Sequence, residues 1–244
     1  MSKIGEFHFV SESYLLDFRG RVTIPMMGNY LLHASSTHAE QRGFGFNAMA
    51  SQGCAWVLSR MVIEMKSYPT MLQPFTITTW VEDANKLFTS RCFAIRNAEG
   101  EAMGYCRTLW AAIDLESRKP TDLARLDNNL HSFIVDEPCP IEKPGQIQAA
   151  EKDTEGEPYK VRYSDLDVNG HFNSIKYIEH LLDMFDLSMF ADKEVSRFEI
   201  AYMAEGKYGM EMFLHKKEID PLRYVTSICD KDGKAICRAE ITWK

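Results

Sequence analysis

The feature that most constrains the fold of this 244-residue chain is that its second half repeats the pattern of its first half. Gly100–Trp110 reads GEAMGYCRTLW and Gly233–Trp243 reads GKAICRAEITW, so Gly, Ala and Trp coincide at an offset of 133 residues. Four further pairs follow the same offset loosely: Val62 and Val195, Phe75 and Tyr208, Trp80 and Phe213, and Ile95 and Ile228. In each half a helix-like segment precedes several strand-like segments. The pattern predicts two related domains that arose by internal duplication.

Period-two alternation of apolar side chains identifies the predicted strands. It is clearest over 235–243, where Ala, Cys, Ala, Ile and Trp alternate with the residues between them, and it recurs over 61–66 and 208–214. The turn sequences Asn97–Gly100 and Asp230–Gly233 each separate two such segments and predict β-hairpins. Because hairpins join antiparallel strands, the expected sheet is antiparallel and not doubly wound.

One helix is expected in each half, near residues 28–40 and near residues 175–185. In the second helix the apolar residues fall at helical spacing and leave little polar surface; they are Ile175, Tyr177, Ile178, Leu181, Leu182, Met184 and Phe185. A helix that is apolar nearly all round is buried. The expected fold class is therefore α+β, with an antiparallel sheet wrapped around one central helix in each domain.

Proline content marks the predicted boundary between the two domains. Five of the nine prolines lie within residues 117–158, and the polar run EKDTEGE occupies 151–157. Proline removes backbone donors and favours extended chain. We expect an N-terminal domain over 1–120, a proline-rich polar linker over 121–157 and a C-terminal domain over 158–244.

Charge and cysteine usage exclude several classes of protein. The chain has 28 Lys and Arg against 35 Asp and Glu, a net charge of −7, which argues against a general nucleic-acid binder and against an anionic membrane surface. The six cysteines form no CxxC pair and no His cluster accompanies them, so free buried thiols and no metal site are expected. The first residues contain no signal-peptide pattern, and apolar runs are too short for a membrane span; a cytoplasmic protein is predicted.

The most informative segment for chemistry is Tyr163–Asn173, which reads YSDLDVNGHFN directly before the second predicted helix. Asp, Asn and Gly favour turns, so these polar groups are expected on a loop that enters the helix, with Asn173 or Ser174 as the N-cap. Free backbone N–H groups at such an entry can hold an oxyanion. The segment fits either a plain turn with a surface His171, or an acid–base site in which His171 exchanges a proton.

Glu205 is a second candidate, at the end of the strand-like run Phe198–Glu205. Apolar residues on both faces of this run suggest a buried strand. Its terminal acid is open to two interpretations: a solvated surface residue, or a base that reaches toward the loop around His171.

The segment DLDVNGHFN at 165–173, continuing through Lys176–Ile178, closely resembles the catalytic region of acyl-acyl-carrier-protein thioesterases. That family includes the plant plastid enzymes that end fatty acid synthesis and their bacterial relatives. In the first half, Trp56–Met61, Tyr68–Thr70 and Thr79–Val81 resemble the N-terminal domain of the same family. The resemblance extends from about Asp17 to Trp243.

This resemblance implies a double hotdog fold, in which two hotdog domains each hold a long helix in a curved antiparallel sheet. It places the catalytic Asp, Asn and His of the family on Asp167, Asn169 and His171, and the downstream catalytic Glu on Glu205, with no cofactor and no metal. In the plant members a Cys, long considered a nucleophile, follows that Glu. Here the position is Gly206, so a Cys at this position cannot be required for activity of this chain.

The function implied is hydrolysis of acyl-acyl carrier protein by activated water, which releases a free fatty acid and ends chain elongation. Glu205 and His171 would orient and deprotonate the water, and the sequence leaves open which of the two is the base. Asn169 would fix the substrate or the water, and Asp167 would hold the loop or the His. No GxSxG motif suggests a serine nucleophile. The N-terminal domain would line the acyl pocket, and its methionines are candidate lining residues: Met26, Met27, Met49, Met61 and Met65.

The partner implied is acyl carrier protein with its phosphopantetheine-linked acyl chain. Carrier protein is acidic and so is this chain, so docking requires a local basic patch. The candidate pairs are Arg19 and Arg21, Arg118 and Lys119, Lys160 and Arg162, and Lys216 and Lys217.

Three rival functions remain open: an acyl-CoA thioesterase of the same fold, a hotdog dehydratase, and a non-catalytic acyl-binding protein. The Asn-x-His spacing together with Glu205 argues against the dehydratase. A homodimer is compatible with the fold but not implied by it, because a double hotdog already pairs its two helices. The lack of a plastid transit sequence fits a bacterial, cytoplasmic member.

Overall fold

The computed structural model describes residues 2–126 and 129–244 and divides the chain into two compact units. Unit 1 is Met1–Lys143 and unit 2 is Pro144–Lys244. The division falls inside the segment 121–157 that was expected to link the domains. Much of that segment is packed: Leu123, Leu130, Cys139 and Ile141 are buried in unit 1, and Ile147 and Ala150 are buried in unit 2.

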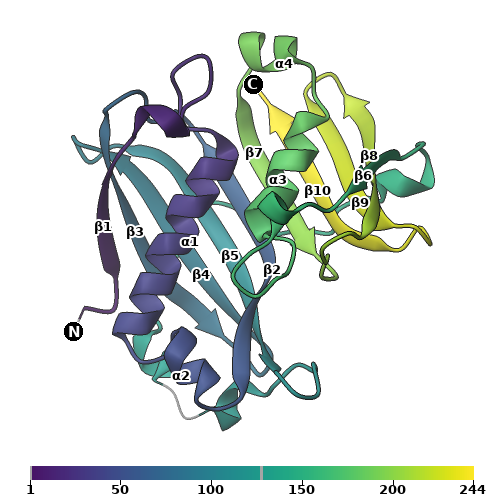
Figure 1. Cartoon of the computed structure of the whole chain (residues 1–244). Coiled ribbons are helices and arrows are strands. Elements are labelled where there is room, and N and C mark those ends of the chain that lie inside the picture. The colour runs from purple at the N-terminus through teal and green to yellow at the C-terminus, as the bar shows by residue number, and fades with distance from the viewer. Residues whose placement is uncertain (1, 127–128) are drawn as a thin grey trace. The chain divides into compact units, whose positions relative to one another are not determined.

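Unit 1 is an antiparallel sheet in the strand order β1-β3-β4-β5-β2 with a long helix against it (Figure 1). Its elements in chain order are β1 (Gly5–Val10), η1 (Ser13–Leu15), α1 (Ile24–Gln41), α2 (Phe46–Ala50), β2 (Cys54–Met65), β3 (Pro74–Ala84), β4 (Phe88–Asn97), β5 (Ala102–Asp114), η2 (Leu123–Arg125) and η3 (Leu130–Phe133).

Unit 2 repeats this plan in the strand order β6-β8-β9-β10-β7, again antiparallel throughout. Its elements are η4 (Ala150–Lys152), β6 (Glu157–Lys160), η5 (Tyr163–Asp165), α3 (Ser174–Asp183), α4 (Leu187–Asp192), β7 (Val195–Tyr202), β8 (Glu211–Asp220), β9 (Arg223–Asp230) and β10 (Ala235–Trp243). The two sheet orders are identical when the strands are renumbered from the first of each unit. The predicted duplication and the α+β double hotdog fold are confirmed.

Local sequence signals account for the helix starts. Thr23 caps α1 by accepting a hydrogen bond from Met26 N at 3.3 Å, and Asn173 caps α3 by accepting from Ile175 N at 2.8 Å. The expectation that the second helix runs to Phe185 and is apolar nearly all round is wrong. It ends at Asp183, and Phe185 packs instead against Trp243, with ring centroids 5.3 Å apart.

The two hairpin turns are confirmed. Gly100 and Gly233 both have positive φ, 83° and 77°, and each donates its N–H across the turn to the residue three positions earlier. Two strand boundaries were wrong. β8 begins at Glu211, because the preceding residues form a turn with Gly209 at φ 76°. β7 ends at Tyr202, so Glu205 lies on the connection beyond the strand.

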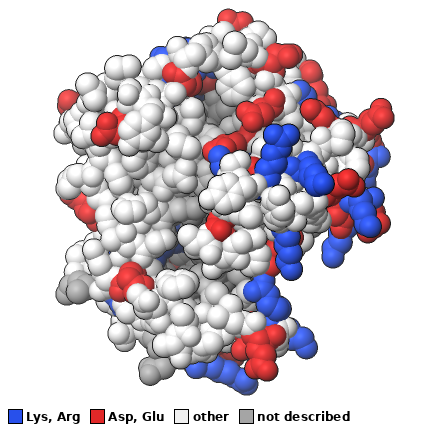
Figure 2. Space-filling view, viewed as in Figure 1, with Lys and Arg blue, Asp and Glu red and all other residues white. Residues whose placement is uncertain are grey.

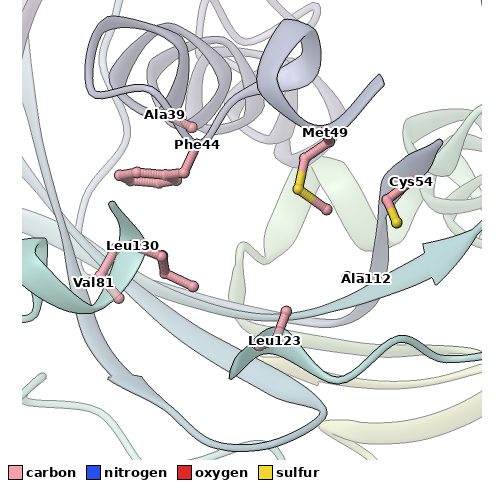
Figure 3. Close-up of a cluster of buried hydrophobic side chains, with 8 residues drawn as sticks. All are labelled: Ala39, Phe44, Met49, Cys54, Val81, Ala112, Leu123 and Leu130. Atoms are coloured by element: carbon pink, nitrogen blue, oxygen red, sulfur yellow. The ribbon is translucent and has the colours of Figure 1, made fainter. Parts of the chain in front are cut away.

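Apolar clusters fill both units, and all six cysteines are free and buried, as expected. Figure 3 shows one cluster of unit 1, in which Phe44 and Met49, from around α2, face residues of the sheet and of η2 and η3. In Figure 2 the viewed face over α1 is largely uncharged, whereas acidic and basic side chains are interspersed over unit 2. No helix in residues 2–126 and 129–244 is long and apolar enough to cross a membrane.

Candidate active site

The loop that carries the predicted catalytic residues is a tight turn organised by one carboxylate. Asp167 Oδ1 accepts hydrogen bonds from Asn169 N at 2.8 Å and from His171 N at 3.0 Å. The Asp167 backbone makes two more hydrogen bonds. Its N–H donates to His171 O at 2.8 Å, and its carbonyl oxygen accepts from Gly170 N at 3.0 Å. Gly170 has φ 75°, which favours glycine there. Asp167 therefore fixes the direction in which His171 leaves the turn.

His171 and Glu205 are brought together, although 34 positions separate them in the sequence. His171 Nε2 lies 3.6 Å from Glu205 Oε2, and both side chains are partly exposed, at 29% and 37%. The two segments are tied by the hydrogen bond from Phe172 N to Gly206 O at 2.9 Å and by a β-bridge between His171 and Lys207. Catalytic contacts are often long before substrate binds, so this pair can serve as an acid and a base facing one solvent-accessible point.

Asn169 stands at the tip of the turn. Its backbone N–H bonds to Asp167, and the residue itself is exposed, beside Val168, which is fully exposed. A ligand that approaches the loop would therefore meet the Asn169 amide before it met the turn beneath.

Beneath the loop lies a buried polar network that sequence reasoning missed. Asp165 is 2% exposed and accepts hydrogen bonds from Tyr159 Oη at 2.6 Å, Arg162 N at 2.7 Å and His180 Nε2 at 3.0 Å. Burial raises the pKa of Asp165, but these hydrogen bonds outweigh burial and the pKa lies below its ordinary value. Asp165 also holds the helix start, because its carbonyl accepts from Asn173 N at 2.7 Å.

A second support is Tyr177 of α3. Its buried hydroxyl accepts a hydrogen bond from Gly206 N at 2.9 Å, next to Glu205. Burial raises the pKa of Tyr177, so the phenol stays protonated and can donate as well as accept. The only sequence signal for this role was the apolar stripe of the helix, which gave no reason to separate Tyr177 from its neighbours.

Unit 1 contains a second copy of the loop, which follows η1 as the first follows η5. Asp17 Oδ1 accepts from Arg19 N at 2.9 Å and from Arg21 N at 3.0 Å. The Asp17 N–H donates to Arg21 O at 2.8 Å, and the Asp17 carbonyl oxygen accepts from Gly20 N at 2.9 Å. Gly20 has φ 73°. These are the four hydrogen bonds and the glycine conformation of the turn at Asp167.

The turn in unit 1 has the same backbone conformation, but other residues stand where His171 and Glu205 stand in unit 2. Arg21 takes the place of His171, and its guanidinium lies on the Asp17 carboxylate, with Nη2 2.8 Å and Nε 3.1 Å from Oδ2. Val22 N bonds to Pro69 O at 2.9 Å, as Phe172 N bonds to Gly206 O, so Tyr68 takes the place of Glu205. A guanidinium is charged at all ordinary pH values, so this copy lacks a group that exchanges protons near neutrality.

Comparison with known proteins shows the family to which the chain belongs. The acyl-ACP thioesterase N-terminal domain matches residues 6–126, and the acyl-ACP thioesterase C-terminal domain matches residues 148–244. The chain belongs to the acyl-ACP thioesterase family. A structure of an acyl-ACP thioesterase from Bacteroides thetaiotaomicron is 37% identical and superposes with a TM-score of 0.92, covering 99% of this chain and 98% of the other.

Two further relatives share less sequence with this chain. The 12:0-ACP thioesterase of Umbellularia californica is 20% identical with a TM-score of 0.89 over 100% of this chain and 98% of its own, which shows a shared fold. The chloroplastic acyl-[acyl-carrier-protein] hydrolase FATB3 of Cuphea viscosissima is 26% identical over 81% of this chain and 50% of its own length. This chain thus spans about half the length of that curated relative.

This acyl-ACP thioesterase family member departs from the plant pattern at Gly206, where those enzymes have Cys. A Cβ at Gly206 would lie 2.4 Å from Met212 Cε, 2.9 Å from Phe172 Cβ and 3.0 Å from Tyr177 Oη. Met212 Cε is the end of a flexible side chain and can move aside, but Phe172 Cβ is attached directly to the backbone. A larger side chain at Gly206 therefore requires the segment at Phe172 to shift.

Proposed function

We propose that this protein hydrolyses the thioester of acyl-acyl carrier protein and releases a free fatty acid. The observation that carries the proposal is the His171–Glu205 pair, 3.6 Å apart on a partly exposed surface of unit 2. Family membership supplies the substrate class, and we place the reaction in the cytoplasm, where it would end chain elongation.

The geometry favours direct attack by water. Glu205 and His171 can together hold a water molecule and remove its proton as oxygen attacks the thioester carbonyl carbon. The proton then passes to the departing thiolate sulfur through His171, and the acyl group leaves as a carboxylic acid. Asn169, exposed at the tip of the turn, would donate its amide N–H to the substrate. Asp167 takes no part in proton transfer; it positions His171.

The oxyanion is proposed to lie at the start of α3, where backbone N–H groups and the helix dipole favour negative charge. Ile175 N is already bonded to the Asn173 cap. The remaining N–H groups of the first turn are the candidates.

The deciding experiment measures thiol release by His171→Ala and Glu205→Gln variants on acyl-carrier substrates. General acid–base catalysis contributes about 10²- to 10⁴-fold, so each variant should lose at least about 100-fold in kcat with the same folding transition as the wild type. Glu205→Gln keeps the size of the side chain and removes its charge. Near-wild-type turnover by both folded variants would overturn the assignment.

The carrier docking site is proposed at Lys160 and Arg162, joined by Lys207. All three are exposed, and Tyr163, which follows Arg162 in the chain just before the loop at Asp167, is 86% exposed. Basic charge with an exposed aromatic residue suits an acidic protein carrier. In two of the other predicted basic pairs one residue is engaged elsewhere: Arg21 pairs with Asp17, and Lys217 pairs with Asp153 at 2.5 Å.

An acyl-CoA thioesterase is the second candidate function, because the same pair would perform the same hydrolysis. The double variant Lys160→Glu/Arg162→Glu separates the two. If the carrier is the substrate, this variant should raise KM for acyl-carrier protein, weaken its salt dependence and leave kcat unchanged. Equal kinetics of variant and wild type on the carrier, with faster turnover of acyl-CoA, would favour the second candidate.

A further inference from the structure

A short segment near the end of unit 1, residues 134–141, is tied to the sheet by hydrogen bonds from two side chains. The Trp80 indole of β3 donates to Glu137 O at 2.8 Å, and Arg107 Nη2 of β5 donates to Cys139 O at 3.2 Å. Cys139 and Ile141 are buried by this contact. The segment therefore holds the Cys139 side chain against the sheet.

Cys139 meets a second cysteine there, Cys92 of β4. Both belong to one buried cluster, and the two thiols share a hydrogen bond. Cys92 is completely buried, whereas Cys139 is 7% exposed, more than any of the other five cysteines of the chain. Two sulfur atoms are thus neighbours, and one of them can be reached from solvent.

A guanidinium with unused donors borders this thiol pair. Arg107 lies opposite Cys92 in the register of β4 and β5, and its side chain is 6% exposed. Its Nη2 lies 3.0 Å from Glu82 Oε1. Its Nε and Nη1 are buried, and among the described residues they have no hydrogen-bond partner. Because unmet buried donors are costly, these surroundings favour a negative charge on a neighbouring group.

The same contacts make the two sulfur atoms unequal. The hydrogen bond with Cys92 lowers the pKa of Cys139 against the effect of burial, and the Ile141 N–H and Arg107 lower it further. That hydrogen bond, together with burial, raises the pKa of Cys92. Cys92 therefore keeps its proton and donates it toward the Cys139 sulfur. The thiolate is the reactive form of cysteine, so Cys139 is the nucleophile of the pair.

We propose that Cys139 is a site of reversible oxidation by hydrogen peroxide and that Cys92 is its resolving cysteine. The Cys139 thiolate attacks one peroxide oxygen, the O–O bond breaks, and Cys139 becomes a sulfenic acid while the released hydroxide takes up a proton as water. The Cys92 sulfur then attacks the Cys139 sulfur and the S–O bond breaks. The second hydroxide leaves as water with the proton of Cys92. In total, two thiols are oxidised to one disulfide and one peroxide is reduced to two waters.

The disulfide would join residues 134–141 covalently to β4. A cross-link of this kind restricts the unfolded chain and so stabilises the fold. Oxidation should therefore raise the urea midpoint of the protein, and a reductant should reverse the rise. The inference concerns unit 1 alone and does not depend on the hydrolysis proposed for unit 2.

The test treats the folded protein with increasing hydrogen peroxide, alkylates the remaining thiols and maps the cysteines by peptide mass spectrometry. In the wild type, Cys92 and Cys139 should disappear together into one disulfide, at doses that leave Cys106 reduced, and dithiothreitol should restore both. In Cys92→Ser, dimedone should label Cys139 as a sulfenic acid. Oxidation of the other cysteines before Cys139, or a disulfide that forms only in urea, would overturn the proposal.

Cys106→Ser is the matched control. Cys106 is the residue before Arg107 and is completely buried, and burial raises the pKa of its thiol, so its loss should leave the oxidation of Cys139 unchanged. The double variant Glu82→Gln/Arg107→Met removes both members of the ion pair and should slow the reaction of Cys139 with peroxide at neutral pH about tenfold. An unchanged rate in the double variant, or an equal loss in Cys106→Ser, would contradict the proposal.

The wild type decides the outcome even if a variant does not fold. Its disulfide is identified by the cross-linked peptide, and its stability is followed by urea unfolding before and after peroxide. Six thiols that remain equally reduced at every dose, or a urea midpoint that peroxide does not raise, would refute the role of this pair.

Discussion

The duplicated turn provides a test of Asp167 that separates catalysis from architecture. Asp167 and Asp17 make the same four turn hydrogen bonds, two through Oδ1 and two through the backbone. Only Asp167 is followed by a histidine that faces a glutamate. Alanine at either position removes the two side-chain hydrogen bonds and leaves the backbone bonds of the turn in place. The pair therefore gives two nearly identical structural perturbations with different expected consequences for catalysis.

The expected loss of stability follows from the hydrogen bonds removed. Asp167→Ala frees two N–H groups on an exposed loop, where water replaces the carboxylate, so the free energy of unfolding should fall by about 1–2 kcal/mol. Asp17→Ala frees the equivalent two and also the Arg21 guanidinium, whose side chain is 11% exposed. That variant should lose about 2–3 kcal/mol.

The expected loss of activity has the opposite order. Without the Asp167 carboxylate, His171 leaves the turn in a less fixed direction, and a displacement of about 1 Å can cost about 100-fold in rate. We expect Asp167→Ala to lower kcat by about that factor. Asp17→Ala should stay within about twofold of the wild type, because Arg21 exchanges no proton during hydrolysis.

The assay combines urea unfolding followed by circular dichroism with steady-state thiol release at a temperature where both variants are folded. One result refutes the reasoning directly: equal loss of kcat in Asp17→Ala and Asp167→Ala. A second refuting result is full activity of Asp167→Ala together with the predicted fall in stability. That result would show that the Asp167 carboxylate does not position His171 for catalysis.

Three further predictions concern residues around the same loop. Gly206→Cys should destabilise unit 2 and lower kcat rather than create a nucleophile, since its Cβ would lie 2.9 Å from Phe172 Cβ, next to His171; a stable, faster enzyme would contradict this. Tyr177→Phe leaves Gly206 N–H without its acceptor and should cost about 1–3 kcal/mol in a urea titration, whereas an unchanged midpoint would show that the bond is dispensable. The Asp165 pKa is lowered on folding, so its stabilisation is present above about pH 4 and disappears as the pH falls through the folded pKa. Asp165→Asn should therefore reduce the acid dependence of unfolding free energy below about pH 4, and parallel curves for variant and wild type would exclude this role.

Much of the fold could be predicted from periodicity and turn chemistry. The strand at 235–243 alternates cleanly, and Gly100 and Gly233 occupy turns that need positive φ. Both signals are local and depend on one or two residues. Element ends were less predictable: Met184 and Phe185 fit the helical stripe, but the helix ends before them, and Phe185 is buried by distant Trp243.

The candidate catalytic residues were identified by resemblance, but the residues that support them could not be predicted. Asp165 was visible as a turn-forming acid two positions before Asp167, and nothing in its spacing distinguished the buried carboxylate from the partly buried one. Its partners Tyr159 and His180 lie 6 and 15 positions away, on a strand and a helix. Such a network depends on how β6, η5 and α3 pack, which a single sequence does not show.

The second copy of the loop was hidden for a different physical reason. The strands of the two halves align at an offset of 133, whereas Asp17 and Asp167 differ by 150, because unit 1 has more residues between its loop and its hairpins. Part of the difference is the central helix, 18 residues in α1 and 10 in α3.

Only the Asp and the Gly of the turn are shared between the copies, since four hydrogen bonds to one aspartate and one positive φ are enough to form it. The proposed hydrolysis requires in addition a histidine and a glutamate that faces it. Unit 1 has Arg21 and Tyr68 at those places, and its arginine neutralises the carboxylate that shapes the turn. The turn is therefore present in both units, whereas the candidate acid–base pair of His171 and Glu205 is present in unit 2 alone among the described residues of the two turns.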